Sequence, residues 1–117
     1  MKKDDFHDYI MHDVFSGMYG ITSRPLFGGH GIYKDGVIFA IIVKDELYFK
    51  VGEKNRQDFN KYDSEPFRYT MPNGKKVEMP YRKLPDEIME DRGALPAWIE
   101  KSVYPKQNGS KKKPPKK

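Results

Sequence analysis

The chain has 117 residues and no cysteine, and its residues are 37% hydrophobic and 33% charged. This length suits one domain with a single core, and the lack of cysteine excludes disulfides, thiol catalysis and thiolate metal sites. The longest apolar run, Val37 to Val43, is far shorter than the about 20 residues of a membrane-spanning helix. The first residues also lack the pattern of a secretory signal. We therefore predict a cytoplasmic protein with no membrane contact.

The formal net charge of +5 is concentrated near the C-terminus. Residues 105–117 contain six lysines and no acidic residue, which leaves 16 basic against 17 acidic residues in residues 1–104. Because a segment of Lys, Pro, Gly and Ser cannot bury a core, we predict a folded domain at residues 1–104 and a disordered basic tail at residues 105–117. The tail is either a solubilising segment or an arm for weak, non-specific nucleic-acid contact. Its candidate phosphate contacts are Lys111, Lys112, Lys113, Lys116 and Lys117.

The first half of the chain predicts a helix followed by a three-stranded antiparallel meander. Apolar residues recur at helical spacing from Phe6 to Met18, so a helix is expected from about Asp5 to Ser16. Asp35-Gly36 is a strong short-range hairpin signal, and the strand that follows it should be central. The expected strands are Leu26–Tyr33, Val37–Val43 and Leu47–Val51.

The second half predicts a short helix, a hairpin and a last helix. The short helix is expected within Glu53–Tyr62, the hairpin turn at Pro72-Asn73-Gly74, and the last helix at Ala94–Val103. The predicted fold class is therefore α+β, with an antiparallel sheet of five or six strands built from a meander plus a hairpin. An N-terminal helix, a short middle helix and a C-terminal helix complete it. The core residues expected to lie together are Phe39, Ile41, Leu47 and Trp98.

The run Phe27-Gly28-Gly29-His30-Gly31 has three interpretations. A phosphate-binding loop needs glycines that lead into a helix N-terminus, whereas this run leads into a strand. A catalytic His30 would need partners, yet no Gly-x-Ser-x-Gly, His-Glu-x-x-His or Ser–Lys pattern accompanies it. Positive φ angles, a bulge or the close approach of another backbone explain the glycines better. We predict no catalytic residue, no cofactor and no metal.

Aromatic and basic residues alternate along the expected strands, as in proteins that bind single-stranded nucleic acid. The alternative is a sheet face on which tyrosine rings are half buried and their hydroxyls reach water. Because residues 1–104 have no excess positive charge, we favour the alternative. The residues concerned are Tyr33, Tyr48, Tyr69 and Tyr81 with Lys34, Lys50, Arg68 and Arg82.

An ordered set of short runs resembles the N-terminal domain of the TfoX (Sxy) family of bacterial competence regulators. The resemblance covers about residues 6–104 and derives its specificity from the order of the runs. These runs are Arg24-Pro25-Leu26-Phe27-Gly28-Gly29-His30-Gly31-Ile32-Tyr33, Asp35-Gly36-Val37-Ile38-Phe39-Ala40, Leu47-Tyr48-Phe49-Lys50-Val51, Glu65-Pro66-Phe67-Arg68-Tyr69, and Met79-Pro80-Tyr81 with Leu84-Pro85.

The resemblance implies a non-enzymatic, stand-alone interaction module. Full-length TfoX regulators act as co-activators with the cyclic-AMP receptor protein at competence promoters, so the implied partner is a protein, specifically a transcription factor. Two alternatives remain: a small-ligand or enzymatic site near His30, and the weak nucleic-acid contact by the tail. The oligomeric state stays open. The candidate interaction segment comprises Arg24, Phe27, Gly28, Gly29, His30 and Gly31.

Overall fold

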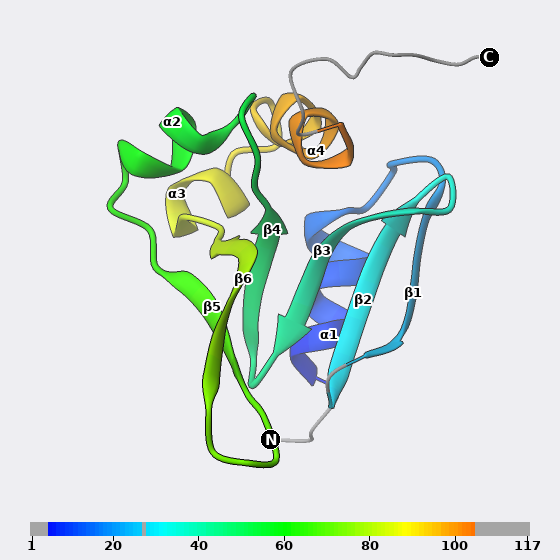
Figure 1. The fold of residues 1–117 in the computed structure, drawn as a ribbon. Helices are drawn as coiled ribbons and strands as arrows, with labels where there is room; N and C mark the ends of the chain where they lie inside the picture. The colour runs from blue at the N-terminus through cyan, green and yellow to red at the C-terminus, as the bar shows by residue number, and fades with distance from the viewer. Residues whose placement is uncertain (1–4, 27, 105–117) are drawn as a thin grey trace, which may run out of the picture.

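The computed structural model describes residues 5–26 and 28–104. It shows an α+β fold with an open antiparallel sheet (Figure 1). The first helix comprises α1 (Asp5–Tyr9) and the π-helical turn η1 (Ile10–Val14). As the apolar spacing predicts, Ile10 and Val14 are buried. Gly17 follows with a φ of +81°, a conformation that suits the end of a helix.

The C-terminal end of this first helix is capped by a distant part of the chain. The guanidinium group of Arg92 donates hydrogen bonds to the carbonyl oxygens of Asp13 and Ser16, at 2.9 and 2.6 Å. Carbonyl groups at the end of a helix have no partner within it. Arg92 therefore adds a second donor to the Asp13 carbonyl, which also accepts from the N–H group of Ser16, and supplies a donor to the Ser16 carbonyl.

Six strands form the sheet in the order β1-β2-β3-β4-β6-β5. The expected strand from Leu26 to Tyr33 is wrong, because the chain reverses direction between β1 and β2. Gly28 lies in that turn with a φ of +77°, and Leu26 pairs with Gly29 across it. The hairpin turn predicted at Asp35-Gly36 is confirmed. The resulting four-stranded meander consists of β1 (Ile21–Leu26), β2 (Gly29–Lys34), β3 (Val37–Val43) and β4 (Glu46–Lys50).

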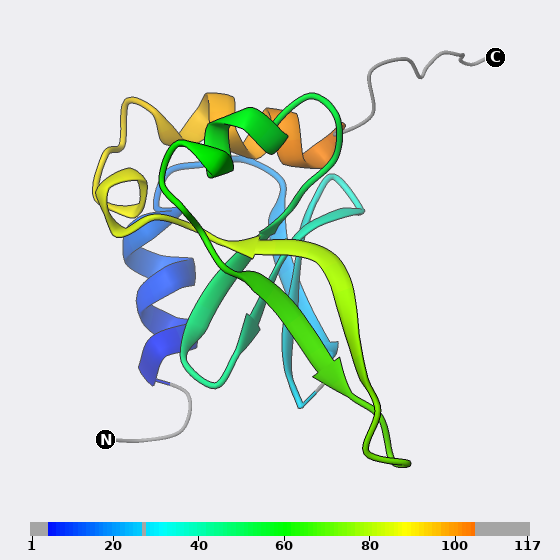
Figure 2. The same ribbon diagram turned by 60° about the vertical axis from the view of Figure 1, so that its left-hand side comes forward.

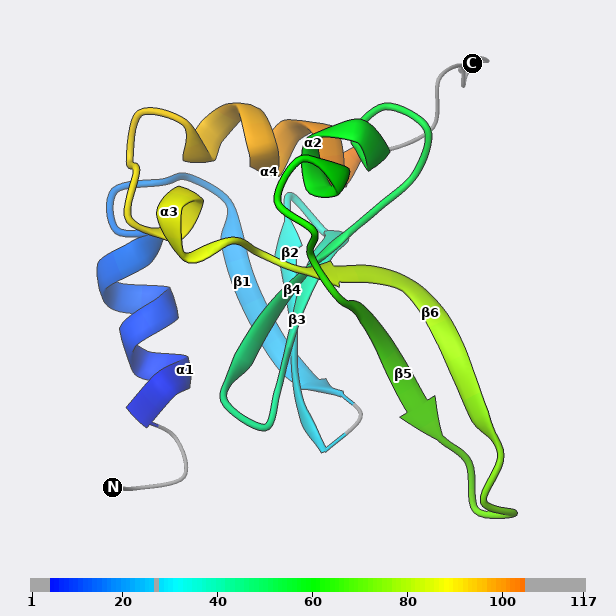
Figure 3. The same ribbon diagram turned by 90° about the vertical axis from the view of Figure 1, so that its left-hand side faces the viewer.

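The second predicted hairpin is formed by β5 (Pro66–Thr70) and β6 (Lys76–Lys83). β6 pairs with β4, which leaves β5 at the edge of the sheet. The β5–β6 ladder is irregular between Pro66 and Arg68, opposite the part of β6 that contains Pro80. Proline has no N–H group for a ladder and is typical of such irregularities. Figure 3 shows the hairpin projecting beyond the rest of the sheet.

Three further helices pack with the first one against the sheet (Figure 2). They are α2 (Arg56–Asn60), α3 (Asp86–Met89) and α4 (Leu95–Val103). The short middle helix and the C-terminal helix are where the sequence predicts them. Each helix contributes buried side chains to one hydrophobic cluster, including Phe59, Ile88, Leu95 and Ile99.

Two hydrophobic clusters lie on opposite faces of the sheet. The larger one lies between the sheet and the helices and contains Phe39 and Leu47, with Trp98 packed against it, as expected. The expectation that Ile41 joins them is wrong, because Ile41 belongs to a smaller cluster with Phe67 and Tyr81. We call the side of the smaller cluster the helix-free face.

A β-bulge in β3 explains the position of Ile41. Ile32 pairs with Ala40 and the next residue, Tyr33, pairs with Ile38, so Phe39 is an extra residue in β3. Side chains of a regular strand alternate between the two faces, and a bulge interrupts this alternation. Phe39 and Ile41 therefore face opposite sides although they are two residues apart.

Candidate functional site

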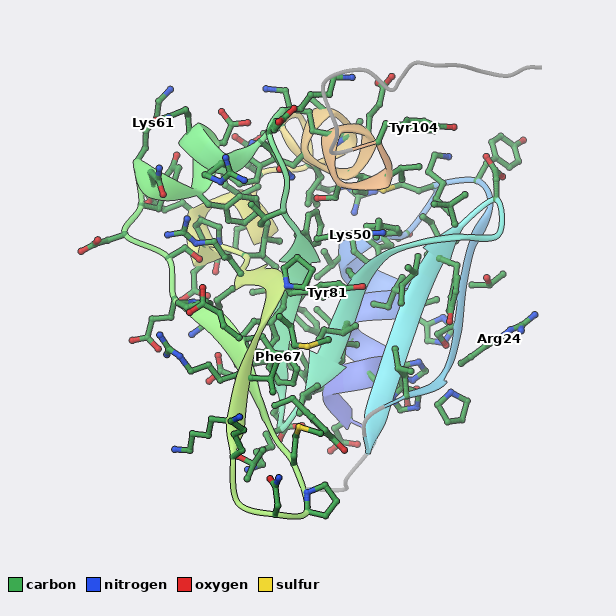
Figure 4. All side chains as sticks on the ribbon, viewed as in Figure 1. Arg24, Lys50, Lys61, Phe67, Tyr81 and Tyr104 are labelled. Atoms are coloured by element: carbon green, nitrogen blue, oxygen red, sulfur yellow. The ribbon has the colours of Figure 1, made fainter. Side chains whose placement is uncertain are left out.

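The predicted interaction segment lies at the β1 edge of the sheet. Arg24 is an exposed residue of β1, and Gly29, His30 and Gly31 begin the adjacent strand β2. Figure 4 shows the Arg24 side chain extending outward from β1. Its guanidinium carbon is 5.8 Å from the centre of the Tyr33 ring, a cation–π distance. Phe27 lies outside the described residues.

The glycines beside Arg24 have structural reasons. A Cβ atom on Gly29 would lie 1.8 Å from the carbonyl oxygen of Ile42, so only glycine permits this approach of the two backbones. A Cβ atom on Gly31 would lie 2.9 Å from a methyl carbon of Leu26. Gly28 has positive φ. The structural interpretation of the run is thereby confirmed, and the glycines keep β1 and β3 close to β2.

His30 is stacked on a histidine from the first helix. The rings of His7 and His30 are 3.9 Å apart between centres, with 21° between their planes. The Nε2 atom of His7 is 2.9 Å from the hydroxyl oxygen of Ser23 in β1. Neither of these two contacts of His7 is predictable from the sequence, because no local spacing signals a contact between segments so far apart. These contacts attach α1 to the β1–β2 hairpin.

The order Ser23, His7, Asp8 superficially matches a serine–histidine–aspartate series. However, the Nδ1 atom of His7 is 3.8 Å from the nearest carboxylate oxygen of Asp8, which is too long for a hydrogen bond, and the Asp8 side chain is 66% exposed. A solvated carboxylate at this distance does not orient the imidazole for catalysis. In residues 5–26 and 28–104, no group of three or more His, Cys, Asp or Glu side chains is placed to hold a metal ion.

A surface cavity of about 400 Å³ lies beside the stacked histidines. His7 and His30 line it together with the backbone of the Gly28–Gly29 turn and residues of β3 and the turn after it. Lys44 and Asp45 give the cavity one charge of each sign. A small polar molecule is the chemical class that such a lining suits.

The four tyrosines that alternate with basic residues in the sequence all lie on the helix-free face. Their common side depends on the strand register, which the sequence alone does not give. Tyr81 is part of the smaller cluster, and Tyr48 and Tyr69 pack against it. Tyr33 lies 3.3 Å from the Cβ position of Gly31, where Leu26 and Ile38 also meet. Position on one face is the first requirement for a base-stacking surface.

The other requirements for nucleic-acid binding are poorly met. Arg82 donates a 2.7 Å hydrogen bond to the carbonyl oxygen of Ser64, and Arg68 is 3.5 Å from the carboxylate of Glu78. Tyr81 is only 7% exposed. Its burial, with a smaller effect of the nearby Tyr33, raises the pKa of its hydroxyl above the ordinary value. The packing favours a second small core over a platform for bases.

The C-terminal lysines Lys111, Lys112, Lys113, Lys116 and Lys117 lie outside the described residues. Where the structure does describe the chain, none of its helices has the length and apolar character needed to cross a membrane.

In comparisons with known proteins, the family model described as "TfoX N-terminal domain" matches residues 13–104. No curated protein matches the chain.

Proposed function

Because the chain belongs to the TfoX N-terminal domain family, we propose that it is a non-enzymatic protein-interaction module and a cytoplasmic co-regulator of transcription. The proposed partner is a transcription factor, which the family resemblance implies. The proposed contact is the β1 edge with the segment from Arg24 to Gly31. The observation that carries this proposal is that β1 is an edge strand of the sheet. This edge strand also contains the exposed residue Arg24.

The geometry around His7 supports binding over catalysis. The distance between His7 and Asp8 and the exposure of the carboxylate make the series with Ser23 unsuited to activating a hydroxyl. The hydrogen-bond contact between His7 and Ser23 links α1 to β1, so the edge strand is supported by the first helix. Rigid support lowers the entropy lost on binding.

Affinity capture from the native cell tests the proposal. The intact chain is used as bait beside two charge reversals, Arg24→Glu in β1 and Arg68→Glu in the opposite edge strand β5. We expect the intact chain and Arg68→Glu to capture the same transcription factor or polymerase subunit, and Arg24→Glu to lose it. If the intact chain captures neither class of protein, the regulatory role is wrong.

A small-ligand site beside His30 is the second candidate function, favoured by the cavity of about 400 Å³. A thermal-shift screen of metabolites tests it, because a ligand at 100 times its dissociation constant stabilises a fold by about 2.7 kcal/mol. We expect no stabilisation. A metabolite that stabilises the intact chain but not His30→Ala would favour this candidate instead.

A further inference from the structure

The strand register shows which backbone groups of β1 point away from the sheet. β1 and β2 are paired without interruption from Ile21–Lys34 to Leu26–Gly29. Just before this ladder, the N–H group of Asp35 donates a 2.9 Å hydrogen bond to the carbonyl of Gly20. Hydrogen-bonded pairs alternate with non-bonded pairs in an antiparallel ladder. The even-numbered residues of β1 therefore bond to β2, which also suits the two-residue turn after Leu26.

The main-chain N–H and carbonyl groups of the odd-numbered residues of β1 accordingly point toward the free edge of the sheet. Ile21 and Ser23 each present an N–H group and a carbonyl there, and Pro25 presents a carbonyl. Proline is tolerated at an edge strand where its missing N–H would face solvent, which explains Pro25 inside a strand. No other strand of the described chain lies beyond β1 (Figure 1). The edge is therefore a row of groups ready to pair with another strand.

Arg24 gives this edge a charge preference. Its side chain is on the helix-free face, as its contact with the Tyr33 ring shows. In residues 5–26 and 28–104, Arg24 makes no ion pair with a carboxylate, whereas Arg68, the arginine of the other edge strand, lies 3.5 Å from Glu78. Directly opposite positions on adjacent strands bring Cβ atoms to about 4.5–5.5 Å. A carboxylate on an added strand would therefore reach the Arg24 guanidinium.

The β5 edge does not offer the same complementarity. The N–H group of Met71 donates a hydrogen bond to the carbonyl of Lys75. Because bonded and non-bonded pairs alternate along the ladder, the main-chain groups of Arg68 and Thr70 point away from β6, toward the free edge of β5. There the arginine is already paired, since Arg68 lies 3.5 Å from Glu78. An acidic strand added at β5 would have to compete with Glu78. The observations therefore favour β1.

We propose that β1 receives an extended acidic segment of a partner protein as an additional antiparallel strand, with a carboxylate of the segment opposite Arg24. The inference rests on the proposed interaction function and specifies its partner. Main-chain hydrogen bonds to Ile21, Ser23 and the Pro25 carbonyl provide affinity, and the side chains on the helix-free face provide selectivity. Opposite Leu26 an apolar residue fits, and opposite Thr22 a β-branched one.

The first test follows amide hydrogen exchange by NMR in the full chain. In the free protein we expect fast exchange at Ile21 and Ser23 and slow exchange at Thr22 and Arg24, which already bond to β2. The synthetic peptide acetyl-Val-Thr-Glu-Thr-Val-Thr-amide should slow the exchange at Ile21 and Ser23. N-methylation of the threonine after the glutamate should abolish this protection, because that N–H faces Ser23. N-methylation of the following valine, whose N–H faces away, should preserve it.

The second test reverses the charges. Arg24→Glu should weaken binding of the peptide about tenfold, and a peptide with lysine in place of the glutamate should restore it. Arg68→Glu, on the other edge strand, should leave binding of the original peptide unchanged. Loss of binding in Arg68→Glu alone would place the added strand at β5 and overturn the assignment to β1.

The outcomes separate this inference from the proposed function. If the peptide at millimolar concentration does not slow exchange at Ile21 and Ser23, or if both N-methyl peptides behave alike, strand addition at β1 is wrong. A transcription factor captured by the intact chain would still support the interaction role. Conversely, peptide pairing without such a captured partner would support the edge chemistry and reject the regulatory role.

Discussion

The two faces of the sheet are built from the same strands but are packed very differently. The helix-covered face holds a large cluster of buried hydrophobic residues that come from the sheet and from the helices. Among the residues that the structure describes, the cluster on the helix-free face buries only Ile41, Phe67 and Tyr81, and Arg24 lies at the margin of this face. This difference suggests that one face supplies most of the stability, which leaves the other face free to carry polar groups for recognition.

The largest effect should follow from emptying the helix-covered core. Phe39 is fully buried and its ring meets those of Phe15 and Phe49 at 5.8 and 5.4 Å. We expect Phe39→Ala to lower the free energy of unfolding by about 3–5 kcal/mol, as is typical of a large core aromatic residue. Urea unfolding measures the loss. A loss below about 1 kcal/mol would contradict the division between the faces.

A smaller effect should follow from the matched change on the helix-free face. Phe67 is 7% exposed, contacts Tyr48 at 5.1 Å between ring centres, and lies in the smaller cluster. Because Phe67 is less completely buried than Phe39 and belongs to the smaller cluster, we expect Phe67→Ala to cost about 2 kcal/mol in the same urea assay. A loss equal to or above that of Phe39→Ala would contradict the expectation that the helix-covered face supplies most of the stability.

The helix-free face should also make stability depend on pH in the alkaline range. Burial raises the pKa of Tyr81 above its ordinary value of 10.0, so the unfolded chain loses this proton at lower pH than the folded chain. The contribution of Tyr81 to the free energy of unfolding should be fully present below the pKa of the unfolded tyrosine and should fall as the pH rises through the pKa of the folded one. Urea unfolding across this range should show a shallower fall for Tyr81→Phe. Tyr19→Phe, at a residue that is 90% exposed, is the control and should match the unchanged chain.

The smallest effect on stability should follow from removing residues 105–117, which we propose to be a disordered tail. Deletion should change the free energy of unfolding by no more than about 0.5 kcal/mol. It should nevertheless abolish weak DNA binding, which for six lysines would have a slope of about −5 in log affinity against log salt. Fluorescence anisotropy with two unrelated duplexes across a salt series measures this. Salt-resistant or sequence-selective binding by the shortened chain would contradict binding through the lysines and would favour the tyrosines of the helix-free face as the DNA-binding surface.

Elements with strong local signals could be predicted from the sequence. The Asp35-Gly36 turn and the last helix follow from turn chemistry and apolar spacing, and both are confirmed. The turn at Gly28 was missed, because a glycine run inside an apolar stretch also fits a bulge. The bulge at Phe39 was missed as well, because bulges depend on the pairing of two strands and leave the alternation of one strand unmarked.

The candidate site was predictable only in part. The segment from Arg24 to Gly31 is recognisable from its unusual glycines, but the outward direction of Ile21 and Ser23 depends on the ladder with β2. The stacking of His7 on His30 likewise requires the helix to cross the β1–β2 hairpin. Such contacts arise from tertiary packing, which local propensities do not encode.

The hydrogen bonds of Arg92 link the beginning and the end of the fold, and this has a consequence for the order in which the protein folds. Arg92 and its acceptors Asp13 and Ser16 are 79 and 76 residues apart in sequence. Contacts this distant form late, whereas the hairpins of the meander close locally. During synthesis the first helix leaves the ribosome long before Arg92 does. We therefore expect the nascent helix to dock on the meander through its contacts with Phe39 and Phe49, while the carbonyl groups at its C-terminal end wait for Arg92 until nearly the whole domain has emerged.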